Sequence, residues 1–406
     1  MIEVLKKEDC CGCYSCANIC PKGCIEMCSN SEGFVYPKVY TEKCIDCSLC
    51  ERKCPILSQK KSLPLNAVYA FAVSNKNENI RLHSSSGGIF SVLAEYTIKR
   101  GGVVFGAAFN TNFHEVQHIS VDNSDSLKFL CGSKYVQSCI GESYKNVQEF
   151  LKKGILCLFT GAPCQIEGLK SFLGREWDNL ICADIICHGV PSPKVWNKYA
   201  EELEKKYSSN IVGVDFRSKV TGWKRSSVII KFGNQSCMES LQSDNCYMKV
   251  FKSNIMLRPS CYNCKFKNVA HISDFTLGDF WGADKLKPDI DDDKGLSLVI
   301  VHNKKGAEIL NSVKESFNVF EPIGIDEAVR YNMALIKSEI PHKNREHFFR
   351  YIDKYSLKKL SNRFATPVLT TPYQWLAYIL QRIGIFKICK RLKDEIRSII
   401  MARKGK

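Results

Sequence analysis

The chain has 406 residues, a hydrophobic fraction of 45% and a formal net charge of +16. At roughly 150 residues per domain, this length predicts two or three domains. Its 22 cysteines are too many for an ordinary intracellular protein, and the chain is too long for a small disulfide scaffold. The first residues show no apolar signal segment, and no stretch is long and apolar enough to span a bilayer. We therefore expect a cytoplasmic protein, and the lack of a nucleic-acid-binding motif argues against nucleic acid as a partner.

Two runs of four cysteines lie within the first 54 residues. Each run has the spacing C-x2-C-x2-C-x3-C and is followed by proline. This spacing is typical of bacterial ferredoxins with two [4Fe–4S] clusters, in which the fourth cysteine of each run binds the other cluster. Zinc sites use paired cysteines instead of runs of four. The spacing predicts cluster I on Cys10, Cys13, Cys16 and Cys54, and cluster II on Cys44, Cys47, Cys50 and Cys20.

Alternating strand and helix patterns follow the polar linker SQKKSLPLN. We expect strands at 67–73, 103–109, 155–161 and 180–187, with helices after the turn at 83–88 and at 143–154 and 164–174. Such alternation predicts an α/β core with a mixed, partly parallel sheet. After residue 205 the pattern predicts more strands, at 211–217, 226–232, 274–282 and 296–303. From about residue 340 we expect helices rich in Lys and Arg.

Four further cysteines stand where ligands can be presented together. Cys164 and Cys187 each follow a predicted buried strand, while Cys261 and Cys264 form a C-x2-C pair. Loops after the carboxyl ends of strands converge in α/β sheets, so these thiols could form a third four-cysteine site. A C-x2-C pair is also half of a zinc site or a redox dithiol, and spacing alone leaves these alternatives open. The remaining ten are interpreted as small buried hydrophobes or incidental thiols: Cys11, Cys24, Cys28, Cys131, Cys139, Cys157, Cys182, Cys237, Cys246 and Cys389.

A Ser/Gly turn, RLHSSSGG at 81–88, precedes a predicted helix. Its hydroxyls, its free N–H groups and the positive helix terminus suit a phosphate, although a serine cap with a glycine turn is also commonplace. Clusters pass single electrons whereas most organic substrates exchange two, and a flavin bridges that mismatch. The candidate flavin-binding residues are Arg81, Ser84, Ser85, Ser86, Gly87, Gly88, Lys134, Tyr135, Gln137, Gly161 and Gln165.

Two polar residues beside Cys187 are candidates for proton transfer. Asp184 and His188 flank this cysteine and form our predicted catalytic pair. His188 could equally hold a backbone group by a structural hydrogen bond. Asp274 and Asp279 either bind a ribose or polar substrate or cap a turn.

Six segments occur together in one order: HSSSGGIF at 83–90, GSKYVQS at 132–138, TGAPCQ at 160–165, CHGVPSP at 187–193, LRPSCYNC at 257–264 and LGDFWG at 277–282. On these segments the chain resembles the coenzyme F-420 hydrogenase/dehydrogenase beta-subunit family over roughly residues 1–340. The resemblance implies a ferredoxin module, an FAD-binding α/β domain and a further [4Fe–4S] centre near the flavin. We accordingly divide the chain into a two-cluster domain (1–60), a family N-terminal region with the phosphate turn (61–150), a family C-terminal region with the third site (151–340) and a basic helical tail (341–406).

Together these features predict an iron–sulfur flavoprotein oxidoreductase that acts on a small molecule and exchanges electrons with a ferredoxin or another redox protein. A non-catalytic electron-transfer subunit is the first alternative, and a zinc-bearing binding protein with a ferredoxin graft is the second. The basic tail either packs on the core or contacts a membrane surface or a partner.

Overall fold

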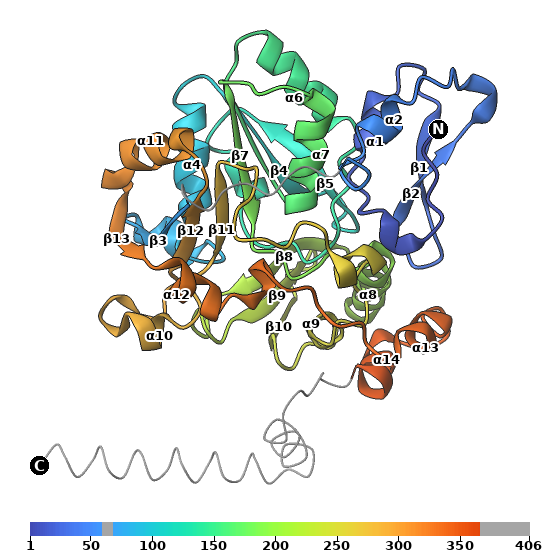
Figure 1. The fold of residues 1–406 in the computed structure, drawn as a ribbon. Coiled ribbons are helices and arrows are strands. Elements are labelled where there is room, and N and C mark those ends of the chain that lie inside the picture. Colours follow the sequence, from blue (N-terminus) through green and yellow to red (C-terminus); the bar gives the residue numbers. More distant parts are fainter. Residues whose placement is uncertain (59–67, 366–406) are drawn as a thin grey trace, which may run out of the picture. The chain divides into compact units, whose positions relative to one another are not determined.

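The computed structural model describes residues 1–58 and 68–365. Nearly all of the predicted linker, the greater part of the basic tail and Cys389 lie outside the described residues. Figure 1 shows a central sheet, a second smaller sheet and an N-terminal module. No helix in the two described ranges has the length and apolarity needed to cross a bilayer.

The central sheet is mixed, as predicted. Its strand order is β13-β3-β12-β11-β7-β6-β4-β5. Neighbouring strands from β4 through β6 and β7 to β11 are parallel, and all the other pairs are antiparallel. Its strands are β3 (Tyr69–Asn75), β4 (Val103–Phe109), β5 (Val116–Val121), β6 (Cys157–Gly161), β7 (Leu180–Ile185), β11 (Phe275–Asp279), β12 (Ser297–Val301) and β13 (Phe317–Ile323).

Buried side chains alternate between the two faces of this sheet. In β6, Cys157 and Phe159 pack beneath α6 and α7, while Leu158 between them packs beneath α4 and α11. This period of two, apolar on both faces, is what a strand covered on both sides requires. The helices are α3 (Glu78–Leu82), α4 (Ile89–Ile98), α5 (Leu127–Leu130), α6 (Ser143–Lys152), α7 (Pro163–Leu173), α10 (Ala283–Leu286), α11 (Lys304–Ser312) and α12 (Ile325–Arg330).

A second core lies under a three-stranded antiparallel sheet of order β10-β9-β8. Trp196 of α8, fully buried, packs on Phe216 of β8 and Tyr247 of α9. The elements here are β8 (Ile211–Ser218), β9 (Ser227–Phe232), β10 (Cys237–Leu241), α8 (Pro193–Tyr207), α9 (Cys246–Lys252), α13 (Arg345–Arg350) and α14 (Leu357–Phe364). The short 3-10 helix η4 (Pro259–Asn263) carries the C-x2-C pair.

The N-terminal module pairs two short helices with a hairpin, α1 (Ser15–Ile19), α2 (Leu49–Arg52), β1 (Ile25–Ser29) and β2 (Val35–Val39). Its two cysteine runs fold alike. The residue before the second cysteine is left-handed in both runs, Gly12 at φ +68° and Asp46 at φ +48°. The residue after that cysteine is left-handed too, Tyr14 at +67° and Ser48 at +55°. The sequence repeat is therefore a repeat of backbone conformation.

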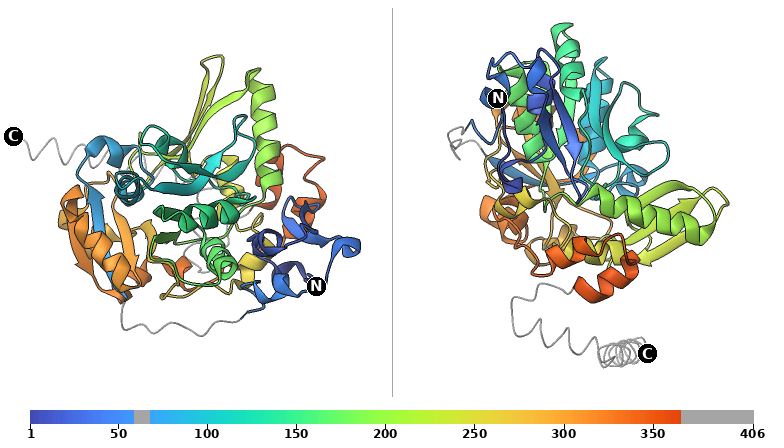
Figure 2. Two further views of the ribbon diagram at one scale, coloured as in Figure 1. Left: turned by 90° about the horizontal axis from the view of Figure 1, so that it is seen from above. Right: turned by 90° about the vertical axis from the view of Figure 1, so that its right-hand side faces the viewer.

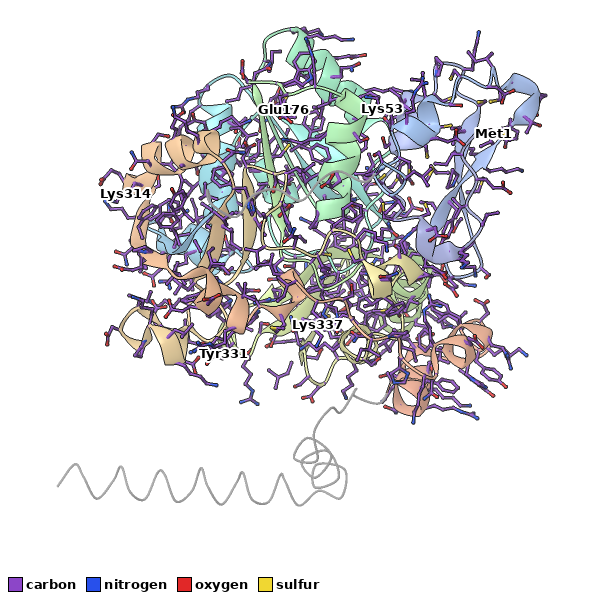
Figure 3. The ribbon with its side chains drawn as sticks, in the orientation of Figure 1. Met1, Lys53, Glu176, Lys314, Tyr331 and Lys337 are labelled. Atoms are coloured by element: carbon purple, nitrogen blue, oxygen red, sulfur yellow. The ribbon has the colours of Figure 1, made fainter. Side chains whose placement is uncertain are left out.

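The module is seated on the core through α7. The Lys53 carbonyl accepts hydrogen bonds from Ser15 of the module at 2.8 Å and from Ser171 of α7 at 2.9 Å. Figure 3 labels Lys53. Position 168 of α7 requires glycine, because a Cβ there would lie only 2.9 Å from the Cys13 Cβ. Figure 2 shows the module beside the core in two further views.

All the strands predicted from sequence are present, with ends shifted by a few residues. The strands β5, β10 and β13 and the helix α8 were not predicted. β5 and β10 are edge strands with exposed residues in alternation, so they lack the apolar run that marks a buried strand.

Candidate iron–sulfur and cofactor sites

The eight cysteines of the two runs divide between two separate hollows. One hollow is lined by three cysteines of the first run and by Cys54 of the second. The other is lined by three cysteines of the second run and by Cys20 of the first. Each hollow thus holds three thiols of one run and one of the other, the crossing that the spacing predicts. The groups are the cluster I cysteines (Cys10, Cys13, Cys16 and Cys54) and the cluster II cysteines (Cys20, Cys44, Cys47 and Cys50).

The two hollows differ in exposure. At cluster I the loop residues Cys11 and Gly12 are buried. The matching residues at cluster II, Ile45 and Asp46, are exposed, with 56% of Ile45 accessible. The cluster I cysteines therefore lie toward the core, and the cluster II cysteines lie away from it.

Cys11 and Cys24, interpreted from sequence as incidental, each lie beside a candidate ligand. The Cys11 thiol hydrogen-bonds with the thiols of Cys13 and Cys164. The Cys24 thiol lies 3.3 Å from that of Cys20. Cys11 thus links the cluster I cysteines to a cysteine more than 150 positions away, a proximity that spacing cannot reveal.

The third cysteine group (Cys164, Cys187, Cys261 and Cys264) gathers beyond Cys11. Donation of its thiol proton toward Cys11, together with burial, raises the pKa of Cys164, and the thiols of Cys187 and Cys264 add to that rise. Burial, with a contribution from Cys187, raises the pKa of Cys261 to about 12. The four thiols therefore lie within electrostatic range of one another.

Local structure presents each thiol of this group. Cys164 stands in the first turn of α7, where the helix dipole favours a thiolate. The Cys261 Sγ accepts a hydrogen bond from the Val190 amide at 3.4 Å, and the Cys264 amide donates to the Ser338 Oγ at 3.0 Å. Burial raises the pKa of Cys187 to about 11, so a bound metal would be needed to keep it ionised at neutral pH.

In the described ranges, no three His, Cys, Asp or Glu side chains converge as closely as a single metal ion requires. The fit of the cysteines to larger clusters therefore rests on the hollows that they line and on their mutual proximity.

The predicted phosphate turn is occupied by internal contacts. Arg81 is buried and makes a bidentate ion pair with Asp292, at 2.8 and 2.6 Å. The Ser86 hydroxyl donates to the Leu296 carbonyl, and a Cβ on Gly87 would lie 2.3 Å from the Val73 carbonyl oxygen. These contacts tie the turn to β3 and β12 and supply a structural reason for its composition.

The remaining residues of that turn are also engaged. The Ser84 hydroxyl donates to the Ile80 carbonyl, and the Ser85 hydroxyl accepts from the amide and hydroxyl of Ser133. Gly88 begins α4 with a left-handed φ of +89°. The turn carbonyls, moreover, face a cation, because the Lys219 ammonium donates to Arg81 and Ser86, both at 2.6 Å.

The other candidate flavin residues have contacts in three places. Gln137 lies against the module, where its amide donates to the Cys11 carbonyl at 3.3 Å. Gln165 caps α7 through the Ala162 amide, with Gly161 packed against it. Tyr135 packs on Phe251 in the second core. A flavin-binding role of these residues stays a prediction.

Lys134 and Lys219 both lie within electrostatic range of Asp215, and we call these two lysines the cationic group (Lys134 and Lys219). Burial lowers the pKa of Lys134 to about 8. Burial and the neighbouring Arg81 lower the pKa of Lys219 to about 7, although its three carbonyl acceptors favour the ammonium form. Two partly desolvated lysines beside one carboxylate make a site that favours an anion.

The two candidate proton-transfer residues, Asp184 and His188, have separate partners. Asp184 is 1% exposed and accepts hydrogen bonds from His271 at 2.8 Å and from Thr276. His188 instead contacts Asn254 at 2.7 Å and Glu339 at 3.1 Å. The two side chains lie in different networks, so any catalytic role of either residue remains a prediction.

Asp274 and Asp279 have structural partners. Asp274 accepts from the Cys182 amide at 2.7 Å. Asp279 forms a bidentate pair with Arg217 and accepts from the Trp223 indole at 2.9 Å. Both side chains thus have partners within the protein, and a role in binding ribose or substrate stays a prediction.

His118 of β5 is a residue that the sequence did not indicate. It is buried, which lowers its pKa to about 4, and its Nε2 lies 2.9 Å from the Thr160 carbonyl. Its Nδ1 has no hydrogen-bond partner in the part of the chain that the structure describes. A neutral imidazole thus stands beside the turn that leads to Cys164.

The fold and these sites define a class: an α/β protein with a mixed sheet, an N-terminal module that holds two four-cysteine groups, and a third such group at the strand ends. Comparison with known proteins gives a family match for one region of the chain. Residues 156–322 match the family model that describes the C terminus of the coenzyme F420 hydrogenase/dehydrogenase beta subunit.

Two relatives are worth describing. An uncharacterised polyferredoxin-like protein of Methanocaldococcus jannaschii is 38% identical over 60 residues, which cover 13% of this chain and 36% of that protein. The chain thus spans about a third of the length of this relative. A chain from the F420-reducing [NiFe] hydrogenase complex of Methanosarcina barkeri is 14% identical, with a TM-score of 0.44, covering 68% of this chain and 93% of that one.

Proposed function

We propose that this protein is an iron–sulfur oxidoreductase that relays single electrons through three [4Fe–4S] clusters to a bound flavin and a small-molecule substrate. The observation that carries the proposal is the division of the eight N-terminal cysteines between two hollows, three plus one in each. Such crossed ligation belongs to two-cluster ferredoxins. The description of the matched family, which names a hydrogenase/dehydrogenase, is consistent with redox chemistry.

The chain's own residues would hold and order these centres. A [4Fe–4S] cluster takes up and gives back one electron at a time. The exposed cluster II loop suits exchange with a ferredoxin or another redox protein. The buried cluster I loop touches the third cysteine group through Cys11, which hydrogen-bonds with Cys13 and Cys164. Electrons would therefore pass from cluster II at the surface to cluster I and then to the third cysteine group.

The cationic group is our candidate for the flavin pyrophosphate, in place of the turn at 81–88. The ammonium of Lys134 donates to the Cys131 carbonyl at 2.7 Å and is half-buried. Bound there, FAD would supply the step between one-electron and two-electron chemistry. Lys134 would hold its phosphates, and Lys219 would fix the adjoining turn.

Anaerobic purification with cofactor counting tests the proposal. At four iron atoms per cluster we expect about 12 iron atoms, no zinc and one FAD per chain. Iron on the N-terminal cysteines alone, with zinc on the third group, would instead support a binding protein carrying a ferredoxin module.

The flavin assignment has its own test, based on pH. Lys134 is charged below its pKa of about 8 and loses its proton above that value. Because an anion binds the charged form, FAD affinity should be constant near pH 7 and should fall above pH 8, by up to about tenfold per unit. Titration of flavin-free protein with FAD should show weaker binding and no such pH dependence in Lys134→Met. The exposed Lys128 offers a control, since Lys128→Met should bind FAD like wild type.

A non-catalytic subunit is the second candidate, favoured because the matched family is described as a beta subunit. In that case the purified chain would reduce artificial dyes without converting any metabolite until its partner protein is added. An intrinsic turnover of substrate by the isolated chain excludes this alternative.

A further inference from the structure

Arg258 is a fully buried arginine, with 0% of its surface exposed. It precedes the C-x2-C pair, yet its side chain reaches the N-terminal module. The guanidinium donates to the Cys10 carbonyl at 2.8 Å, the Val35 carbonyl at 2.9 Å and the Gln137 amide oxygen at 3.2 Å. It also lies 3.6 Å from the Cys10 Sγ and 4.5 Å from the centre of the Tyr36 ring.

All these hydrogen-bond acceptors are neutral groups or a cysteine sulfur. Among residues 1–58 and 68–365, no carboxylate forms an ion pair with Arg258. A buried charge without a counter-charge is strongly destabilising. Arg345 shows the usual solution, because it crosses to the same module and pairs in bidentate fashion with Glu32, at 2.8 and 2.7 Å.

The sequence of the cluster I loop is adapted to this guanidinium. A Cβ on Gly12 would lie 2.7 Å from the Arg258 Nη1. At the matching position of cluster II stands Asp46, whose carboxylate lies 3.7 Å from the Cys44 Sγ. The two loops share a backbone conformation, but one faces a cation and the other carries an anion.

We propose that Arg258 is the internal counter-ion of cluster I and raises its reduction potential above that of cluster II. This inference rests on the proposed function, since a [4Fe–4S] core with four thiolates supplies the negative charge that Arg258 lacks. A nearby cation stabilises the more negative, reduced cluster, whereas Asp46 disfavours reduction of cluster II. One electron then passes inward: cluster II is oxidised by one electron and cluster I is reduced by one, with no bond made or broken.

The anchoring of Arg258 couples this effect to the third cysteine group. Its backbone amide donates to the Val190 carbonyl at 2.9 Å, and its carbonyl accepts from the Cys261 amide at 2.9 Å. The same residue therefore contacts a ligand candidate of cluster I with its side chain and one of the third group with its backbone. Arg258 acts as a positioning residue, and no substrate contact is assigned to it.

A redox titration of the full-length holoprotein, followed by electron paramagnetic resonance, tests the proposal. In Arg258→Met we expect the reduction equilibrium of cluster I to fall by at least tenfold, which lowers its potential by about 59 mV for a one-electron couple. Cluster II should keep its potential. Arg258→Lys restores the charge and should recover most of that shift. Equal shifts in Met and Lys variants would show that packing, and not charge, sets the potential.

A second variant covers the case in which Arg258→Met does not fold. Gln137→Glu gives Arg258 a carboxylate partner at the existing 3.2 Å contact, at the expense of one hydrogen bond to the Cys11 carbonyl. Because the added carboxylate neutralises the guanidinium, it should make cluster I harder to reduce, as in Arg258→Met. The double variant Arg345→Met/Glu32→Gln is the matched control, since it removes a neutral ion pair and should leave both potentials unchanged.

Two outcomes would overturn the inference. One is a cluster I potential that changes by less than threefold in both Arg258→Met and Gln137→Glu. The other is a shift as large as theirs in the double variant Arg345→Met/Glu32→Gln. Failure of the proposed function is distinguishable, because wild-type protein would then lack the iron and the signals before any variant is compared.

Discussion

The two cysteine loops of the N-terminal module have the same spacing and the same left-handed positions, but different surroundings. The cluster I loop lies against α7 and the Arg258 guanidinium, with Gly12 at its closest approach. The cluster II loop exposes Ile45 and Asp46. Ligand spacing thus fixes which centre can form, while burial and nearby charge decide its potential and its neighbours.

The largest difference between the two loops should appear when one cysteine ligand is removed from each. Cys16→Ala removes a buried cluster I ligand and leaves Arg258 without its proposed counter-charge, so we expect the loss of four iron atoms and about 3–5 kcal/mol of stability. Cys47→Ala should also lose four iron atoms, but its half-exposed position predicts a core that unfolds at the wild-type temperature. Iron analysis and thermal unfolding of both variants measure this. Equal destabilisation would contradict the comparison.

A smaller change tests the contact between Gly12 and Arg258. In Gly12→Ala the new methyl group would meet the guanidinium at 2.7 Å, at a φ of +68°. We expect a loss of about 2 kcal/mol in urea unfolding and a cluster I that is harder to reduce. Asp46→Ala, at the matching exposed position, should change stability by less than about 0.5 kcal/mol and make cluster II easier to reduce. We expect the two reduction potentials to shift in opposite directions. Shifts in the same direction at both positions would contradict the comparison.

The smallest expected effect concerns the two extra thiols. Cys11→Ala removes hydrogen bonds to Cys13 and Cys164, so the iron content should persist while the potentials of cluster I and the third centre move. One hydrogen bond of ~1 kcal/mol corresponds to roughly a fivefold change in the reduction equilibrium. Cys24→Ala, beside Cys20, should move cluster II alone. Redox titration of both variants decides whether Cys11 influences cluster I and the third centre.

Local patterns predicted much of the architecture. The buried strands β6 and β7, the helix α7 and the mixed sheet follow from apolar runs and periodicity, and the two cysteine runs do form a repeated local structure. The convergence of Cys164 and Cys187 follows from strands that run in parallel. These features depend on residues near one another in sequence or on the general geometry of a parallel sheet.

Contacts over long sequence distances could not be predicted in this way. Arg258 is about 250 residues from Cys10 in sequence, and nothing in LRPSCYNC indicates that its guanidinium reaches the module. The internal contacts of the turn at 81–88 could not be predicted for the same reason. Its composition suits a phosphate, but Asp292 and the Leu296 carbonyl, more than 200 residues away, satisfy Arg81 and Ser86.

The module packs against a surface formed by Gly168, Arg258 and Arg345. This surface has a consequence for protein engineering. A ferredoxin transplanted onto this core would need more than eight correctly spaced cysteines. It would have to bring a glycine ahead of its second cysteine, an acid where Glu32 stands, and free carbonyls where Cys10 and Val35 now accept. A donor module that lacks these features would leave Arg258 and Arg345 without hydrogen-bond acceptors or a counter-charge. Whether modules can be exchanged between relatives should therefore depend on these contacts and not on the number of cysteines.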